Sequence, residues 1–564
     1  MKNKENVLIN NSVNQTEDPS ENWYGREPEI PETAISETIN TEILICGAGT
    51  GGMVAAIASA KQGVKTLIIE KNSTVGCFKT YVGAIDSKAQ KAVGSKAEVN
   101  KAEIVQDIIR YPAQYDVPEK YFPHSNTVDE KLVNLWANES GEAMDFLADE
   151  LSTYGIKHVA EYDIAEGYHG KFKIYPIHTK FLVPLSKGGP KAVAHSGMGV
   201  IEPWLTKKAK SYGATFMFNT SMIKLVKEGK KVVGIIARKK NGKYIRINAS
   251  KGVLLTTGGY ADDQELFSKL NPQATSVTTY SYVQKGNYGD GIKAGIWAGG
   301  VKDPYPSCML FDRGITKPGG KSGIPFRKGG KLLGPVEAFH FGSQPFMKVN
   351  MDGKRFYNET VPYDAILYPL QFEKNGVMCI IWDSKYWDNI EKFRTIGCSR
   401  QVPSTSEPRT LEGMGKFMSS ALITFHRLRG FVKKANSIEK LAKKLKLPAE
   451  ELKASIERYN QMARAGADED FGKPAKDLIA LEHPPYYGAT NAGWILTTMD
   501  GLHINENMQV LDKNQDVIEG LYAAGDAAGG FFGNNYYPEL FVGVACGKTI
   551  TFARHAILHM TGVN

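Results

Sequence analysis

After a polar N-terminal arm, the chain shows short apolar runs separated by an alanine-rich stretch. Residues 42–46 form an apolar run of strand length, residues 53–61 contain neither Gly nor Pro, and residues 64–69 form a second apolar run after Gly63. Apolar runs of this length are typical of buried strands, and the stretch between them is typical of a helix that ends at a glycine. The pattern therefore predicts a βαβ unit.

Helical periodicity recurs further along the chain. Apolar residues at helical spacing predict helices at residues 129–151, 201–212, 413–428 and 437–466, the last of them interrupted at Pro448.

Strand patterns occur between these helices. From Phe216 onward the β-branched residues predict short strands with breaks at residues 228–230 and 240–243, and the second break is a strong hairpin signal. Residues 252–259 predict a buried strand that ends in a diglycine turn, and residues 348–356 predict another hairpin.

Four glycines occupy the turn of the βαβ unit. Gly47, Gly49 and Gly52 have the spacing G-x-G-x-x-G, and Gly51 lies within it. In a dinucleotide site the first glycine makes the tight turn, the second lets the backbone approach the pyrophosphate, and the third lets the helix pack on the strand. The helix N-terminus offers free N–H groups to the phosphates. This combination predicts a dinucleotide-binding site.

Two further stretches extend the predicted site. Glu70 ends the second strand, with Lys71 beside it, at the distance from the glycines where an acidic residue binds ribose hydroxyls. Near the other end of the chain, in residues 520–530, a strand runs into Gly525 and Asp526. This stretch resembles the second flavin motif of FAD enzymes, in which the aspartate holds a ribityl hydroxyl. The resemblance implies FAD rather than NAD.

The two halves of the nucleotide site lie near opposite ends of 564 residues. We therefore expect one discontinuous FAD-binding domain with a large insertion rather than a row of separate domains. The expected division is a flexible arm and strap at residues 1–39, the first part of the FAD-binding domain at 40–300, a cap that binds substrate at 301–485, and the second part of the FAD-binding domain at 486–564.

Charge and cysteine usage narrow the possible functions. The formal net charge of +9 is scattered among acidic residues, and no motif indicates nucleic-acid binding. The six cysteines form no C-x-x-C pair, so we expect no zinc site, iron–sulfur cluster or c-type haem. Because residues 1–40 lack the apolar run of a signal peptide and no 18-residue apolar stretch occurs, we expect a cytoplasmic protein without membrane insertion.

Together these motifs resemble the flavoprotein family of fumarate reductase, succinate dehydrogenase and 3-ketosteroid dehydrogenases. Residues 23–31 also resemble the N-terminus of single-FAD reductases from anaerobic bacteria. The matching stretches are residues 47–49 with Glu70, 257–259, 289–291, 352–359, 498–502 and 520–526. The resemblance implies an α/β fold with a Rossmann-like FAD-binding domain of the glutathione reductase type and an inserted α+β cap.

The resemblance also implies cofactor contacts. Gly258 and Asp290 lie in matching motifs, and the loop at residues 75–86, which includes Lys79, Thr80 and Tyr81, corresponds to the loop beside the flavin ring. Since no histidine adjoins this loop, we expect the FAD to be bound non-covalently.

The chain departs from the fumarate reductases at the substrate. The family's carboxylate-binding histidine and arginine correspond to Thr497 and Tyr536, and no arginine stands at residues 383–387, where the family has its proton donor. An arginine suits a carboxylate, whereas a phenol suits a neutral ketone because it donates one hydrogen bond without burying a charge. The 3-ketosteroid dehydrogenases have a tyrosine in a setting that matches Tyr536.

From this resemblance we predict that Tyr536, with Tyr537 beside it, polarises a substrate carbonyl, and that Tyr81 is a candidate proton donor. The alternative is an aromatic pair that only packs. We expect Pro538 at the start of a helix that covers residues 540–558, with its N-terminus close to the flavin ring.

The sequence thus predicts a flavin-dependent oxidoreductase that acts on CH–CH bonds. The leading hypothesis is an ene-reductase that saturates a C=C conjugated to a carbonyl in a bulky neutral substrate, a 3-oxo steroid first of all. The alternative is an enoate reductase for fumarate-, urocanate- or cinnamate-like acids, in which Lys385 or Arg355 binds the carboxylate. A third hypothesis, a flavin redox carrier without a small-molecule substrate, does not need a cap. Without a haem motif or a second dinucleotide motif, electrons must come from an external donor, either a reduced carrier protein or a nicotinamide.

Overall fold

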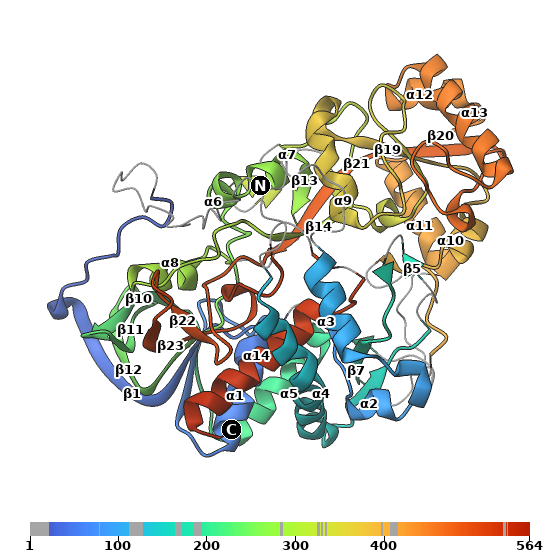
Figure 1. Ribbon diagram of the computed structural model, residues 1–564. Coiled ribbons are helices and arrows are strands. Elements are labelled where there is room, and N and C mark those ends of the chain that lie inside the picture. Colours follow the sequence, from blue (N-terminus) through green and yellow to red (C-terminus); the bar gives the residue numbers. More distant parts are fainter. Residues whose placement is uncertain are drawn as a thin grey trace, which may run out of the picture.

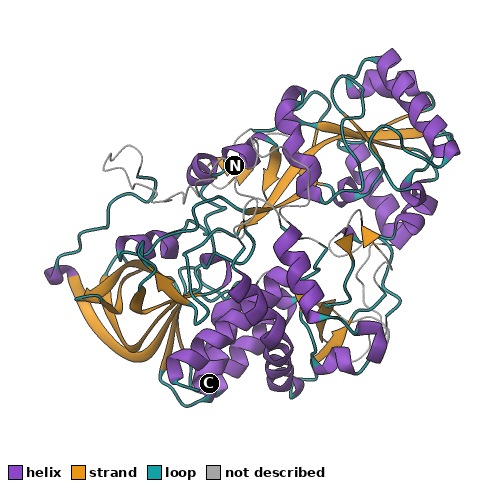
Figure 2. Cartoon of the chain, viewed as in Figure 1, coloured by secondary structure: helices purple, strands orange, loops and turns teal. Residues whose placement is uncertain are grey.

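The computed structural model describes residues 22–77, 79, 81–111, 128–163, 168–169, 172–183, 195–281, 286–323, 327–328, 331–332, 336–395, 399–406, 415–533, 537–538 and 540–563. The described chain forms a large body and a smaller lobe, and strands β14 (Cys308–Thr316) and β21 (Tyr486–Thr498) run from one to the other (Figure 1). Each part is built around its own sheet (Figure 2). Most of the predicted arm, residues 1–21, lies outside the described residues.

The sheet of the body contains the predicted βαβ unit. Strand β1 (Ile35–Cys46) pairs in parallel with β2 (Thr66–Ile69), and helix α1 (Thr50–Lys61) connects them. The strands of this sheet lie in the order β10 (Thr220–Glu228), β11 (Lys231–Lys239), β12 (Tyr244–Leu255), β1, β2 and β9 (Thr215–Met217), while β23 (Val517–Ala523) pairs with β12 and β22 (Gln509–Leu511) pairs with β23. The predicted α/β fold is confirmed.

Strand β12 has two neighbours on one side because it is long. Its first half pairs antiparallel with β11, and residues 253–255 pair in parallel with β23. The sheet therefore contains strands from both ends of the chain. This arrangement brings residues 520–530 to the carboxyl ends of β1 and β12, where the glycine-rich turn also lies.

A layer of helices covers the sheet. Helix α1 packs against α14 (Val544–Thr561) and α5 (Met198–Ser211), and α14 also packs against α4 (Glu130–Ser152) (Figure 1). Every residue of α1 except Lys61 is buried, which explains why this helix is apolar on all faces.

The sheet of the lobe is organised around β21. Its strands lie in the order β17 (Val336–Ala338), β14, β21, β19 (Met378–Trp382) and β18 (Met347–Val349), and β13 (Thr278–Ser281) and β20 (Lys433–Ala435) also pair with β21. Strands β13 and β21 thus belong to this sheet although they lie outside residues 301–485. The expected domain limits themselves stay a prediction.

Aromatic side chains fill the core of the lobe, where Phe339, Phe341, Phe346, Trp382 and Phe393 form one buried cluster. The helices of the lobe are α9 (Tyr363–Leu367), α10 (Tyr386–Phe393), α11 (Gly415–Leu428), α12 (Ile438–Leu445) and α13 (Ala449–Ala465).

The remaining α-helices and strands have ten residues or fewer. The helices are α2 (Lys88–Lys91), α3 (Lys101–Arg110), α6 (Gln264–Leu270), α7 (Pro272–Ser276) and α8 (Asp290–Trp297). The strands are β3 (Val82–Gly83), β4 (Lys157–Ala160), β5 (Tyr168–His169), β6 (Phe172–Lys173), β7 (His178–Val183), β8 (His195–Ser196), β15 (Arg327–Lys328) and β16 (Lys331–Leu332). Strands β3, β4 and β8 pair with β7.

Two predicted elements are wrong in their limits or kind. Helix α14 begins at Val544 rather than at residue 540, because Gly543 adopts φ +81° where its backbone meets β3. An added Cβ at Gly543 would lie 2.5 Å from the backbone nitrogen of Gly83. Pro538 therefore precedes a turn and not the first turn of the helix, since Phe541 N donates to Pro538 O at 3.0 Å.

The predicted hairpin at residues 348–356 is a turn without a second strand. Strand β18 pairs with β19, and the side chain of Asn350 accepts hydrogen bonds from the backbone of Asp352 and Lys354. After the turn, Arg355 forms ion pairs with two carboxylates instead of continuing a strand.

Candidate functional site

A cleft lies beside the glycine-rich turn. It collects nearly all cofactor residues that the sequence predicted, from both ends of the chain. These residues are Gly47, Gly49, Gly51, Glu70, Lys71, Lys79, Gly258, Asp290, Gly525 and Asp526. Gly52 does not line the cleft, and Thr80 lies outside the described residues.

The glycines of the turn differ in what surrounds them. Gly49 is the N-cap of α1, and an added Cβ there would meet only Gly76 O, at 3.8 Å. At Gly52 an added Cβ would lie 1.9 Å from Gly47 O, so the helix packs directly on the turn. Open space therefore lies beside Gly49, where a pyrophosphate would approach the backbone. No side chain caps the first turn of α1, which leaves its N–H groups for phosphate oxygens.

The acidic residue that ends β2 is held in place by backbone donors. The Glu70 carboxylate accepts hydrogen bonds from Ala48 N at 2.9 Å and from Asn72 N at 2.8 Å. Its neighbour Lys71 pairs with Asp290 at 2.5 Å, and both side chains border the same end of the cleft. The carboxylate of Glu70 is thus fixed beside the glycine-rich turn, and its contact with a ribose stays a prediction.

The other end of the cleft carries a group of charges around Asp526. Its carboxylate accepts from Lys79 Nζ at 3.0 Å and from the Thr497 hydroxyl at 2.9 Å. Burial alone would raise the pKa of Asp526, but the charges of Lys79 and Lys548 hold it below its ordinary value. Asp526 is therefore a carboxylate at neutral pH and can accept hydrogen bonds from hydroxyl groups.

Lys548 lies behind the cleft residues Gly525 and Asp526, and the sequence analysis missed it. It is fully buried in α14, and its ammonium donates to Gly525 O at 2.9 Å and to Ala528 O at 3.2 Å. Burial lowers the pKa of Lys548 to about 8, against the opposing charge of Asp526. The available signal was a lysine between apolar residues in the first half of a C-terminal helix, at residues 544–553.

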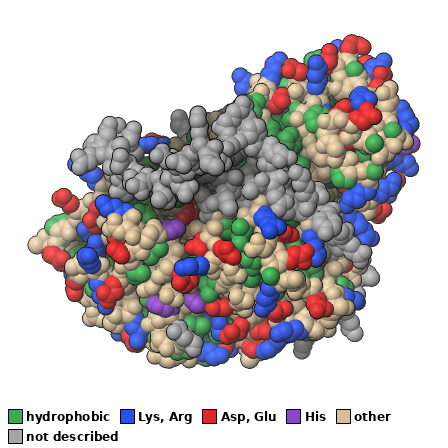
Figure 3. Space-filling model, viewed as in Figure 1, with side chains coloured by type: hydrophobic (Ala, Val, Ile, Leu, Met, Phe, Trp, Pro, Cys, Tyr) green, Lys and Arg blue, Asp and Glu red, His purple; other side chains and the backbone are tan. Residues whose placement is uncertain are grey.

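FAD fits these residues. The cleft joins a helix N-terminus, an acidic residue at the end of β2 and the second motif at Asp526, in the arrangement that a dinucleotide with a flavin requires. Charged side chains of both signs are interspersed on the visible face of the molecule (Figure 3). Among the described residues, no group of three or more metal-ligating side chains occurs, and no helix has the length and apolar character needed to cross a membrane.

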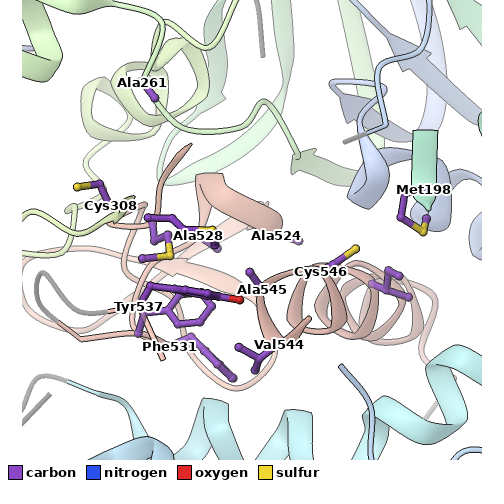
Figure 4. Close-up of a cluster of buried hydrophobic side chains, with 14 of the residues drawn as sticks. Met198, Ala261, Cys308, Ala524, Ala528, Phe531, Tyr537, Val544, Ala545 and Cys546 are labelled. Carbon is purple, nitrogen blue, oxygen red and sulfur yellow. The ribbon is translucent and has the colours of Figure 1, made fainter. Parts of the chain in front are cut away.

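The predicted catalytic residues occupy different places. Tyr537 is buried, packs against Phe532 with 5.6 Å between ring centroids, and extends toward Ala545 at the start of α14 (Figure 4). Tyr81 precedes β3 and meets the His178 ring edge-on, with 4.1 Å between ring centroids, and it does not line the cleft, although Lys79, two residues earlier, does. Tyr536 lies outside the described residues. All three roles stay predictions.

Arg355 and Lys385, the two cations that the sequence analysis considered for a substrate carboxylate, do not line the FAD cleft. Arg355 is buried and already paired with Glu359 at 2.8 Å and with Asp468 at 2.8 Å. Lys385 is more than half exposed on the lobe, beside Asp388. Arg355 is therefore already paired, and neither side chain lines the FAD cleft.

The sequence analysis did not single out Arg313 and Tyr363, two residues of the lobe. Arg313, in β14, is 2% exposed, and its guanidinium lies over the ring of Tyr363, at the start of α9. Tyr363 borders a small second cleft together with Ser343, Ser399 and Leu540 and with the charged side chains of Asp312, Lys348 and Glu359. The sequence signal for Arg313 was a charged pair within the apolar run of residues 308–315.

Comparisons with known proteins agree with this site. The family model described as "FAD binding domain" matches residues 42–538. The chain is 26% identical over 524 residues to vinyl phenol reductase of Lactiplantibacillus plantarum, covering 91% of this chain and 96% of that protein. It is 24% identical over 592 residues to 3-oxosteroid 1-dehydrogenase of Mycobacterium tuberculosis, covering 92% and 98%.

A solved structure shows the same fold. The open conformation of a flavocytochrome c3 fumarate reductase superposes with a TM-score of 0.63 at 23% identity, over 94% of this chain and 79% of that one. The family match spans most of the chain and both halves of the cleft, as the sequence motifs predicted. The chain belongs to the FAD-binding family that this model describes, and it is a flavin-dependent oxidoreductase whose cofactor is FAD.

Proposed function

We propose that the protein is an FAD-dependent ene-reductase that saturates a C=C conjugated to a carbonyl group in a largely apolar substrate. The observation that supports this proposal most is the course of β21. Leu496 and Thr497 line the FAD cleft, and Trp494, two residues earlier, packs beside Phe311 in the sheet of the lobe. The cofactor cleft and an aromatic cluster therefore lie next to each other along one strand, on either side of the β-bulge at Leu496.

When bound, FAD supplies hydride transfer at its ring nitrogen. The residues of the chain then have to hold the carbonyl oxygen and to deliver a proton to the neighbouring carbon. A phenol can do either, because it donates one hydrogen bond without a buried charge. Tyr537, Tyr363 and the predicted Tyr536 are the phenols that we assign to these tasks.

A 3-oxo steroid remains the first substrate to test, in line with the sequence hypothesis and with the 3-oxosteroid 1-dehydrogenase relative. The vinyl phenol reductase relative adds aromatic substrates to the panel. A second candidate, an enoate, is supported by one observation, the buried Arg313, whose guanidinium lies 5.8 Å from the ring centroid of Trp494. In either case the electrons come from an external donor, a carrier protein or a nicotinamide.

Anaerobic reoxidation tests this function. The flavin is photoreduced, and the return of its oxidised absorbance is followed after addition of androstenedione, benzalacetone, cinnamate, fumarate or vinylphenol. We expect rapid reoxidation by at least one enone or enoate, with the saturated product found by mass spectrometry. If none of them reoxidises the flavin faster than buffer does, the protein is a redox carrier and the proposal is wrong.

A further inference from the structure

Helix α11 of the lobe exposes a row of apolar side chains. They are Phe417, which is 82% exposed, Met418 (54%), Ala421, Phe425 (49%) and Leu428 (78%). The other exposed large apolar side chains of the described residues occur singly, at Tyr212, Tyr288, Phe372, Val517 and Val563. Single exposed apolar residues are ordinary on a protein surface, whereas a contiguous group of them marks an interaction site.

The exposed residues form one stripe on α11, which we call the outer stripe. With about 3.6 residues per turn, its members fall within about 100° of the helix circumference. The buried residues Ser419, Ile423 and His426 lie on the opposite side, where the His426 ring meets Phe339 edge-on. A surface helix ordinarily turns its apolar stripe to the core and a polar face to water. Helix α11 presents apolar side chains in both directions.

Cations border the outer stripe on both sides. Helical spacing places Lys416 and Arg427 along one edge and Arg429 along the other, and all three side chains are exposed. The guanidinium of Arg429 lies 5.3 Å from the ring centroid of Phe425, beside the stripe. Residues 413–438 contain no acidic residue, and their other cations are Lys433 and Lys434. The outer stripe is therefore an apolar surface within a positive field.

The neighbouring helix α10 does not cancel this field. It contacts one flank of α11, where the hydroxyls of Tyr386 and Ser420 are 2.6 Å apart. Its acidic residues Asp388 and Glu391 are balanced by Lys392 within the helix and by Lys385 just before it. The positive charge around the outer stripe thus calls for an anionic partner.

The shape of this surface favours a flat partner over a protein. A second copy of the chain would bring the same cations face to face, because both subunits of a two-fold dimer use the same patch. A partner protein that encloses a helix in a groove would collide with α10 at the Tyr386 contact. A lipid surface meets only the outer stripe, and it accepts protruding apolar side chains with cations at the level of the headgroups.

We propose that the outer stripe docks the lobe on the surface of an anionic lipid membrane. Its apolar side chains enter the boundary between headgroups and acyl chains, and Lys416, Arg427 and Arg429 contact the lipid phosphates. Helix α11 has 14 residues and keeps one face in the lobe, so it lies on the membrane and does not span it. This docking goes beyond the proposed function, which needs no membrane.

Co-sedimentation of the FAD-loaded protein with vesicles tests the docking. We expect binding to vesicles of equal parts phosphatidylglycerol and phosphatidylcholine, little binding to phosphatidylcholine alone, and release in 1 M salt, where the screening length is about 3 Å. Phe417→Ser combined with Leu428→Ser should weaken binding about 100-fold, about tenfold for each large apolar side chain. Lys416→Gln combined with Arg427→Gln should weaken it about 25-fold, about fivefold for each cation.

Matched controls alter the same kinds of residue elsewhere. Phe372→Ser removes an isolated aromatic ring of the lobe that is 61% exposed, and Lys240→Gln with Lys243→Gln removes two exposed cations of the body. Both controls should bind vesicles like the wild type. Because every substituted side chain is exposed, the FAD content and the midpoint of thermal unfolding should stay the same in all variants.

Three outcomes would overturn the proposal. Equal binding by the wild type and the serine double variant would show that the net charge of +9 alone attracts the vesicles. Failure of the wild type to bind anionic vesicles at low salt would leave an acidic protein as the partner of the outer stripe. A wild-type dimer that the serine double variant converts to a monomer, measured by analytical ultracentrifugation, would assign the stripe to self-association. None of these measurements needs a substrate, so their results do not depend on the ene-reductase function.

Discussion

Lys79 and Asp526 are 447 residues apart in the sequence and form an ion pair with Nζ 3.0 Å from Oδ1. Both side chains are 13% exposed and border the FAD cleft. The pair joins the loop predicted beside the flavin ring to the second flavin motif. It therefore fixes the two halves of the site to each other and keeps the aspartate ionised.

The Lys79→Met substitution is expected to weaken FAD binding about 10- to 100-fold, which is the worth of a hydrogen bond to a charged group. Without Lys79 the pKa of the buried Asp526 rises, and its protonated form is a poorer acceptor for a ribityl hydroxyl. Equilibrium titration of the apo-protein with FAD, followed by fluorescence, measures the effect. Lys91→Met, on the exposed surface of α2, is the control, and equal FAD affinity in both variants would refute this role of Lys79.

The glycine-rich turn allows a test that separates cofactor binding from folding. Gly49→Val should fold with the stability of the wild-type apo-protein but bind no FAD, because the only atom within 4 Å of its Cβ is 3.8 Å away. Gly52→Ala should destabilise the fold by about 3 kcal/mol or more, since its Cβ would overlap the Gly47 carbonyl. Thermal unfolding of the apo-proteins and FAD titration check the two effects. A Gly49→Val protein that is yellow after purification would contradict the proposed path of the pyrophosphate.

A buried histidine makes stability depend on pH. Burial lowers the pKa of His178 to about 3, against the attraction of Glu161, whose carboxylate lies 3.0 Å away. The unfolded chain binds a proton near pH 6.5 and the folded chain does not, so stability is complete above pH 6.5 and is lost as the pH falls toward 3.

In His178→Asn the dependence of unfolding free energy on pH between 6.5 and 4 should become shallower by about one proton. Glu161 also has a lowered pKa and loses its contribution below its ordinary value, so the measurement is made above pH 4.5 as well as below it. Urea unfolding midpoints at a series of pH values provide the slopes. The same slope in wild type and variant would show that another group titrates in this range.

The parts that could be predicted from the sequence are those that depend on nearby residues. The strands and helix between residues 42 and 69 follow from local apolar runs and glycines, and their roles follow from the spacing. The start of α14 could not be predicted, because Gly543 is held in a left-handed conformation by β3, more than four hundred residues earlier in the chain. The surroundings of the Arg313 guanidinium could not be predicted either, because its contacts with Ser343, Tyr363 and Trp494 exist only in the folded chain.

Tyr537 tests the predicted carbonyl-binding role among the described residues. Tyr537→Phe should keep FAD and its spectrum but lower the rate of flavin reoxidation by an enone about 10²–10³-fold if its hydroxyl holds the carbonyl oxygen. Stopped-flow mixing of the photoreduced protein with substrate measures this rate. A wild-type rate would assign the role to Tyr536, which is to be tested in the same way, or would mean that the pair only packs.

Tyr363 is the candidate proton donor that the structure adds. Its hydroxyl is hydrogen-bonded to the Ser399 hydroxyl at the edge of the second cleft, and the guanidinium of Arg313 lies 5.5 Å from its ring centroid. Tyr363→Phe is expected to retain FAD, to leave the KM nearly unchanged and to lower kcat about 10²–10³-fold, as removal of a general acid does. The matched control is Tyr386→Phe, whose hydroxyl shares a hydrogen bond of 2.6 Å with Ser420 in the same lobe. A solvent isotope effect on kcat that is present in wild type and lost in Tyr363→Phe would identify the phenol as the proton source, whereas equal losses in both tyrosine variants would assign Tyr363 to packing.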